Sequence, residues 1–331
     1  MLGSALGLLL LPPALLQRRG ALELAAAASS TPLAASAWCG NSFPPFAYSL
    51  PWFEFDSSAC SVRIVGDLKP ELDKGLRPLV AVPSPGLTYE YLENLEALTV
   101  SQRRVGFIGL PLSGDTKALA QSLATAITTL DAKRGVHLLA HGLAAPVALK
   151  AAALATPGLV SSIILTSPIG SAQDVEPSIQ DALAESQAPL LATIVSKGRI
   201  CVDATAEASS KVSSQLFAEL QRSLRGRESE LRPVSQLVAA TPPLPLLLAL
   251  SEAGDVISQA ATHDILTAAR SRGDGSSLVR DATFASSGPL PFVDAREEYG
   301  TAILDFCDEV DGVRSRRVAV AGGDQRVMGR V

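Results

Sequence analysis

The most informative stretch for the fold of this chain is Val136-His-Leu-Leu-Ala-His-Gly-Leu-Ala-Ala-Pro-Val-Ala-Leu-Lys150. Its beginning is mostly apolar, and small residues follow Gly142. An apolar run that stops at a glycine is typical of a buried strand ending in a turn, and small residues leave room for that turn to be sharp. The stretch therefore predicts a strand, a tight turn and a helix in direct succession.

Strand-like and helical segments alternate along the rest of the chain. Several strand segments are continuous apolar runs, as in parallel strands that are covered on both faces. Alternation of this kind predicts an α/β protein with a mostly parallel, doubly wound sheet. The expected strands are residues 59–65, 78–82, 105–110, 136–140, 161–166, 245–251 and 278–284, and the expected helices are residues 90–98, 116–130, 146–155, 260–271 and 295–310.

Residues 171–240 interrupt this alternation. They are polar and helical in character, with expected helices at 178–186, 206–225 and 228–238. We expect them to form a small helical lid over the carboxyl ends of the strands. The core of the fold then consists of residues 59–170 and 241–312.

The quoted stretch resembles the nucleophile elbow of α/β-hydrolases, whose motif is G-x-S-x-G. The five elbow positions are Ala140, His141, Gly142, Leu143 and Ala144. Four other segments resemble motifs of the proline iminopeptidase-like α/β-hydrolases in the same chain order. They are residues 79–86 (the H-G-G-P-G oxyanion loop), 109–116, 246–255 (the acid turn) and 288–299 (the histidine segment). The resemblance covers about residues 60–310 and implies an α/β-hydrolase fold.

The same resemblance locates the three positions of the catalytic triad. Gly142 stands where the serine nucleophile is expected, Pro289 where the histidine base is expected, and Asp255 at the position of the acid. Glycine has no side chain, and the proline ring neither accepts nor donates a proton. A Ser-His-Asp mechanism therefore lacks both its nucleophile and its base, and we expect no intact catalytic triad.

The oxyanion loop also departs from the motif. Pro83 has no backbone N–H, whereas Ser84 keeps one. The N–H of Leu143, directly after the elbow glycine, is the second donor that the resemblance implies. Two such donors could hold a small carbonyl or carboxylate ligand without any chemistry, so Ser84, Leu143 and the neighbouring His141 are candidate binding residues.

The three histidines do not restore the missing base. The resemblance implies that His141 packs beneath the elbow. His137 lies on the predicted strand and is expected to be buried, and His263 is expected to face solvent on a helix. No cysteine or carboxylate stands beside the first two, so we expect no metal site and no cofactor.

Composition excludes other classes of function. The chain has 331 residues, a formal net charge of −5 and 5% aromatic residues. Nucleic-acid binding needs a basic face or stacking aromatics, so we expect no nucleic-acid partner.

The amino terminus is interpreted as a targeting segment. Residues 1–37 contain Arg18-Arg19, an almost uncharged Ala-rich run and an Ala35-Ser36-Ala37 ending, as in a cleaved presequence. A plastid address in the thylakoid lumen is favoured over secretion, and a disordered leader or a membrane anchor are the alternatives. The apolar run 6–16 is short and interrupted by Pro12-Pro13, so no spanning helix is expected in the mature protein.

Two flanking segments complete the domain organisation. Residues 38–58 are expected to be an extended arm rich in proline and aromatic residues, closed by a disulfide between Cys39 and Cys60. Residues 313–331 are expected to be a flexible basic tail.

These observations favour an α/β-hydrolase-fold protein that is non-catalytic and serves in binding or as a scaffold. The alternative is an ester- or peptide-cleaving hydrolase of the same family with rearranged catalytic residues. A structural subunit of a larger organellar complex, bound to protein partners, is the third hypothesis.

Overall fold

The computed structural model describes most of the expected core. The described residues are 52–57, 60–65, 76–84, 103–110, 114–130, 134–185, 215–252, 256–272, 278–285, 287 and 290–313. The expected targeting segment 1–37, the helix 90–98, the tail beyond residue 313, and Cys39, Asp255 and Pro289 lie outside these residues.

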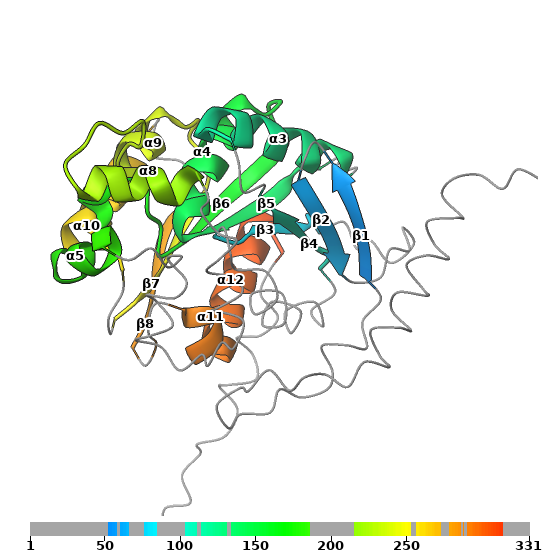
Figure 1. Cartoon of the computed structure of the whole chain (residues 1–331). Coiled ribbons are helices and arrows are strands. Elements are labelled where there is room, and N and C mark those ends of the chain that lie inside the picture. The colour runs from blue at the N-terminus through cyan, green and yellow to red at the C-terminus, as the bar shows by residue number, and fades with distance from the viewer. Residues whose placement is uncertain are drawn as a thin grey trace, which may run out of the picture.

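A single twisted sheet crosses the described part of the chain (Figure 1). Its eight strands follow the order β1-β2-β4-β3-β5-β6-β7-β8. The six strands from β4 to β8 in this order are mutually parallel, whereas β2 pairs antiparallel with both β1 and β4, which confirms the predicted, mostly parallel sheet. The strands are β1 Trp52–Ser57, β2 Cys60–Val65, β3 Leu79–Val82, β4 Val105–Gly109, β5 Val136–His141, β6 Val160–Thr166, β7 Leu246–Ser251 and β8 Val279–Phe284.

Strand β1 corrects the expectation of an arm without regular structure. Six consecutive residues of β1 pair with β2, from Trp52 opposite Val65 to Ser57 opposite Cys60. The segment Phe53-Glu54-Phe55-Asp56 alternates apolar and polar residues, which is the pattern of an edge strand with one covered face.

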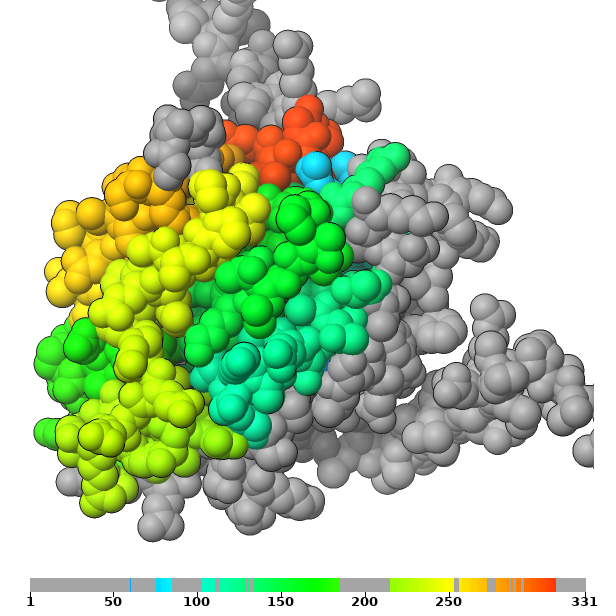
Figure 2. Space-filling model, turned by 90° about the horizontal axis from the view of Figure 1, so that it is seen from above, coloured from blue at the N-terminus to red at the C-terminus, as the bar shows by residue number. Residues whose placement is uncertain are grey.

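Helices cover both faces of the sheet. Helices α3, α4, α9 and α10 pack side by side on one face, and Figure 2 shows this layer from outside. Helix α12 packs on the opposite face against β6, β7 and β8, with α11 before it (Figure 1). The bounds are α3 Thr116–Thr129, α4 Ala145–Leu154, α9 Val234–Ala240, α10 Gln259–Arg270, α11 Pro291–Asp294 and α12 Arg296–Val310.

The structure describes part of the expected lid between β6 and β7. Its described elements are the 3-10 turn η4 (Ala172–Asp174), α5 (Pro177–Glu185) and α8 (Gln215–Leu224), and α5 packs on α8. Helix α9 begins at Val234, not at residue 228, because Pro233 disfavours helical backbone in the residue before it. Since α9 contacts α4 and α10, it belongs to the layer that covers the sheet.

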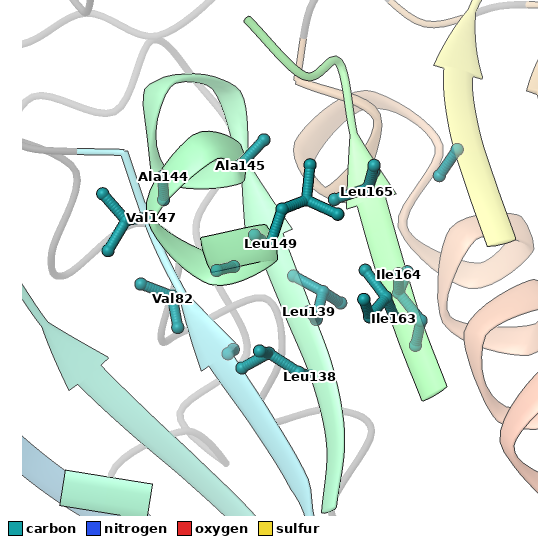
Figure 3. Packing of buried hydrophobic residues seen from close by; sticks show 14 of the residues in the cluster. Val82, Leu138, Leu139, Ala144, Ala145, Val147, Leu149, Ile163, Ile164 and Leu165 are labelled. Atoms are coloured by element: carbon teal, nitrogen blue, oxygen red, sulfur yellow. The ribbon is translucent and has the colours of Figure 1, made fainter. Parts of the chain in front are cut away.

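The core centres on β3, β5 and β6 beneath α4. Figure 3 shows buried side chains of this region, among them Leu138, Leu139 and Ile163 of the strands and Val147 and Leu149 of α4. Every residue of β5 is buried, which explains why this strand reads as a continuous run rather than an alternating one. Among the described residues, no helix has the length and apolar character needed to cross a bilayer.

Two glycine turns meet at the amino ends of β5 and β6. Gly135 and Gly158 both adopt positive φ, at 83° and 86°. A Cβ on Gly135 would lie 2.3 Å from the carbonyl oxygen of Gly158, whereas a Cβ on Gly158 would have no neighbour within 4 Å. The two glycines therefore share a conformation that would strain an L-residue, but they differ in the space around them.

This pair predicts unequal effects of alanine. Gly158→Ala should cost about 1 kcal/mol of unfolding free energy, because an L-residue is strained at positive φ. Gly135→Ala should cost about 3 kcal/mol or more, because the added methyl must also displace backbone. Urea unfolding of the two variants measures the difference, and equal losses would show that the two turns do not pack as described.

Candidate functional site

The predicted elbow is present. Strand β5 ends at His141, a 3-10 turn (η3) covers Gly142–Ala144, and α4 follows at Ala145. Gly142 has a φ of 53°, the left-handed conformation of a strand-to-helix turn under strain. The turn therefore keeps its shape, while the residue at its apex presents no side chain.

The hydroxyl of Ser84 closes the elbow from the neighbouring strand. Its Oγ donates to the carbonyl oxygen of His141 at 2.8 Å and accepts the N–H of Leu143 at 3.1 Å. Ser84 and Leu143 are both buried. The N–H of Leu143, expected as a donor to a ligand, is thus bound to a side chain of the protein itself.

The loop after β6 also contacts the elbow. The N–H of Ile169 donates to the carbonyl oxygen of Gly142 at 3.1 Å. Ser167 in the same loop has a φ of 41°, and its N–H donates to the carbonyl oxygen of Ala249 on β7. The elbow backbone is therefore held by β3 through Ser84 and by the β6 loop through Ile169.

His141 lies in an aromatic cluster beneath the turn. It is 1% exposed, and its ring meets Phe292 of α11 edge-on, with centroids 5.2 Å apart. Phe292 in turn lies 6.0 Å from the ring of Tyr299, whose hydroxyl is 2.8 Å from Oγ1 of Thr166. These contacts give His141 the packing role that the resemblance implied. His263 is exposed on α10, as expected.

Other predicted features have different outcomes. Asp255 and Pro289 lie outside the described residues, so the acid and base positions remain predictions. Cys60 is buried at the start of β2, and since Cys39 lies outside the described residues, the disulfide between them remains a prediction. The described residues contain no cluster of three or more His, Cys, Asp or Glu suited to a metal ion.

The structure brings together a second set of residues that the sequence did not single out. His137 of β5 lies with Nδ1 2.7 Å from Ser162 Oγ on β6 and with Nε2 3.2 Å from Asp311 Oδ1, just after α12. A carboxylate only accepts, so Nε2 carries the proton in the neutral ring and Nδ1 accepts from the Ser162 hydroxyl. Ser162, His137 and Asp311 thus lie in a row, with a hydrogen bond between the first two and a 3.2 Å contact between the last two.

Two arginines complete this buried network. Nη1 of Arg103 lies 2.7 Å from Asp311 Oδ2, and its Nη2 lies 2.7 Å from Asp308 Oδ1. Nη1 of Arg77 lies 2.6 Å from Asp311 Oδ1. Arg77 and Arg103 directly precede β3 and β4, so the network joins the end of α12 to the amino ends of the central strands.

The three side chains Ser162, His137 and Asp311 do not form a relocated active site. Ser162 and His137 are 0% exposed, so no substrate reaches the hydroxyl. The network lies at the amino ends of the strands, whereas the elbow lies at their carboxyl ends. The sequence does show an arginine shortly before each of two strands. No pattern in it indicates that these arginines pair with Asp311.

The electrostatics of the network follow from its burial and its charges. Burial lowers the pKa of His137, although Asp311 acts in the opposite direction. Burial alone would raise the pKa of Asp311, but hydrogen bonds from His137 and Arg103 and their charge hold that pKa below its usual range. Both groups therefore bind protons less readily in the folded chain than in the unfolded one.

Known proteins are similar to this chain in structure. No model of a known protein family matches the chain, and no curated protein matches it in sequence. Solved structures that resemble it are α/β-hydrolase-fold enzymes, and the chain has this fold. The specific resemblance to proline iminopeptidases remains a prediction.

Three of these structures illustrate the likeness. A membrane phospholipase A described as a bacterial virulence factor superposes with a TM-score of 0.56 at 17% identity, over 90% of this chain and 96% of that one. E-2-(acetamidomethylene)succinate hydrolase gives 0.54 at 17%, over 78% and 99%. A serine hydrolase involved in carbazole degradation gives 0.53 at 14%, over 79% and 100%. Identities this low define the fold alone.

The Asp311 network predicts a loss of stability in acid. Because both folded pKa values lie below the unfolded ones, their contribution is complete above about pH 6.5 and declines first as unfolded histidine protonates, then again below about pH 3.9. Urea unfolding across this range measures the decline. His137→Gln should flatten the first step, and His263→Gln, at an exposed position, is the matched control that should retain it.

The elbow predicts a cost for removing the hydroxyl of Ser84. Ser84→Ala leaves the Leu143 N–H and one acceptor site of the His141 carbonyl unpaired in a buried place, at about 1–3 kcal/mol of unfolding free energy. Ser161→Ala removes an exposed hydrogen bond and should change stability by about 0.5 kcal/mol or less. Equal losses in chemical unfolding would contradict the closed elbow.

Proposed function

We propose that this α/β-hydrolase-fold chain is a non-catalytic protein that serves in binding or as a scaffold. The observation that carries the proposal is that Ser84 Oγ donates to the carbonyl oxygen of His141 and accepts the N–H of Leu143, on the two sides of Gly142. The place where a hydrolase presents a nucleophile and an oxyanion donor is here occupied by the chain's own hydroxyl.

The chemistry of acyl transfer supports the same conclusion. A hydrolase of this kind needs a nucleophile at the elbow and a base that takes its proton. Gly142 offers no nucleophile, and the resemblance puts Pro289 at the position of the base. Without both groups, the turn retains only backbone dipoles, and one of its donors is already engaged.

The alternative of a rearranged hydrolase has less support. The Ser162–His137–Asp311 chain has the residue types of a triad, but it is sealed in the core. A small carbonyl or carboxylate ligand at the elbow would have to displace Ser84 from Leu143. Binding of a protein partner elsewhere on the surface does not require that step, and we favour it. Native purification with mass spectrometry identifies such partners and the mature amino terminus.

A serine-reactive fluorophosphonate probe tests the proposal. We expect no labelling of the folded protein and no hydrolysis of p-nitrophenyl acetate beyond that of a heat-unfolded sample, because Gly142 offers no hydroxyl at the nucleophile position. A working serine hydrolase of the same fold is the positive control. Stoichiometric labelling of the wild-type chain would overturn the proposal and favour the rearranged hydrolase.

Gly142→Ser separates the missing nucleophile from the missing base. We expect this variant to remain without turnover, because a serine without a base partner is a weak nucleophile. An increase in ester hydrolysis of about 100-fold or more over the wild type would reveal a base within reach of the elbow. That result would contradict the loss of the base inferred at Pro289.

A further inference from the structure

The insertion leaves and rejoins the core at one place, where the buried carboxylate of Asp174 lies. Asp174 is 1% exposed. Its Oδ2 accepts the N–H groups of Gly170 at 2.8 Å and Ser171 at 2.9 Å, both on the outgoing stem after β6. Both its oxygens lie within reach of the N–H of Val234 on the returning stem, at 3.1 and 3.2 Å. One carboxylate thus bonds both stems.

The two stems also touch through their backbones. A Cβ on Gly170 would lie 2.4 Å from the carbonyl oxygen of Arg232 and 3.0 Å from the nitrogen of Val234. Only a glycine allows this approach without displacement of backbone. The outgoing and returning stems are therefore in direct contact at the level of Asp174.

Helix α9 depends on this carboxylate for its first turn. Its N-cap residue is Pro233, which makes no side-chain capping bond. The carboxylate of Asp174 accepts the N–H of Val234, the first helical residue, and so performs from a distant segment the task of a capping side chain.

The Asp174 turn also holds neighbouring segments. The backbone carbonyl oxygen of Asp174 accepts the N–H of Ser258 at 2.8 Å. The hydroxyl of Ser258 in turn caps α10. The N–H of Ala172 in the same turn donates to Ser223 Oγ on α8 at 3.2 Å. The turn therefore links the insertion to the sheet-covering layer on one side and to α8 on the other.

We propose that Asp174 is a staple that joins the outgoing and returning stems, so that the described helices α5 and α8 form a fixed cap and not a hinged lid. A hinged lid needs stems that rotate independently, and here the same carboxylate must break its bonds to both before either moves. The inference stands apart from the loss of catalysis, because it concerns the stems and is measured without any substrate.

Native-state hydrogen exchange of the wild-type chain tests the staple. Burial raises the pKa of Asp174 to about 6, so exchange is followed at about pH 7.5, where the side chain is ionised. We expect the amides of Gly170 and Val234 to exchange with the same opening free energy and denaturant dependence as Ile164 in β6, through global unfolding. Faster exchange of Val234 with weak denaturant dependence would reveal a hinged lid and overturn the proposal.

Asp174→Asn supplies the matched perturbation. The amide keeps the size of the side chain but removes its charge and places a donor among N–H donors. Exchange of the Val234 amide should accelerate by about 10- to 100-fold relative to Ile164. Asp181→Asn, at an exposed position of α5, should leave it unchanged. Equal exchange in the two variants would refute the staple, and the wild-type measurement decides if Asp174→Asn does not fold.

Discussion

The rest of the sheet depends on the contacts that the buried carboxylate of Asp311 makes with basic side chains. The carboxylate lies beside Arg77, Arg103 and His137, which come from the amino ends of β3, β4 and β5. A buried charge without its partner costs several kcal/mol, so the central strands and α12 must come together for either to be stable. Because α12 covers β6, β7 and β8, docking at this one carboxylate also completes one face of the sheet.

At the other end of β5 the chain satisfies its own backbone. Ser84 accepts the N–H of Leu143, the donor that a hydrolase of this fold offers to its substrate, and Ile169 donates to the carbonyl oxygen of Gly142. The geometry of the turn and the chemistry at the turn are therefore separable. The shape of the turn depends on the positive φ of Gly142 and on small neighbouring residues, and this chain keeps both. Catalysis needs, in addition, side chains that converge from several loops.

Sequence patterns predict the local structure of this chain better than they predict its long-range contacts. Buried strands such as β5 were readable because they are continuous apolar runs, and Gly142 was readable as a turn. The bond between Ser84 and Leu143 joins residues 59 positions apart, and the approach of His137 to Asp311 depends on how α12 docks. Periodicity carries no information on such pairs, although the spacing of Ser171 and Asp174 is a capping signal that could have been read.

The position of Asp311 in the chain also bears on how the protein is made. Arg77 and Arg103 are synthesised first, and the carboxylate that pairs with them comes only after β8 and α12. During synthesis the amino-terminal strands are therefore complete in sequence while their cationic side chains have no buried partner. The arginines can be buried with their partner only after the last helix has been made, and until then the exposed apolar strands are prone to aggregation.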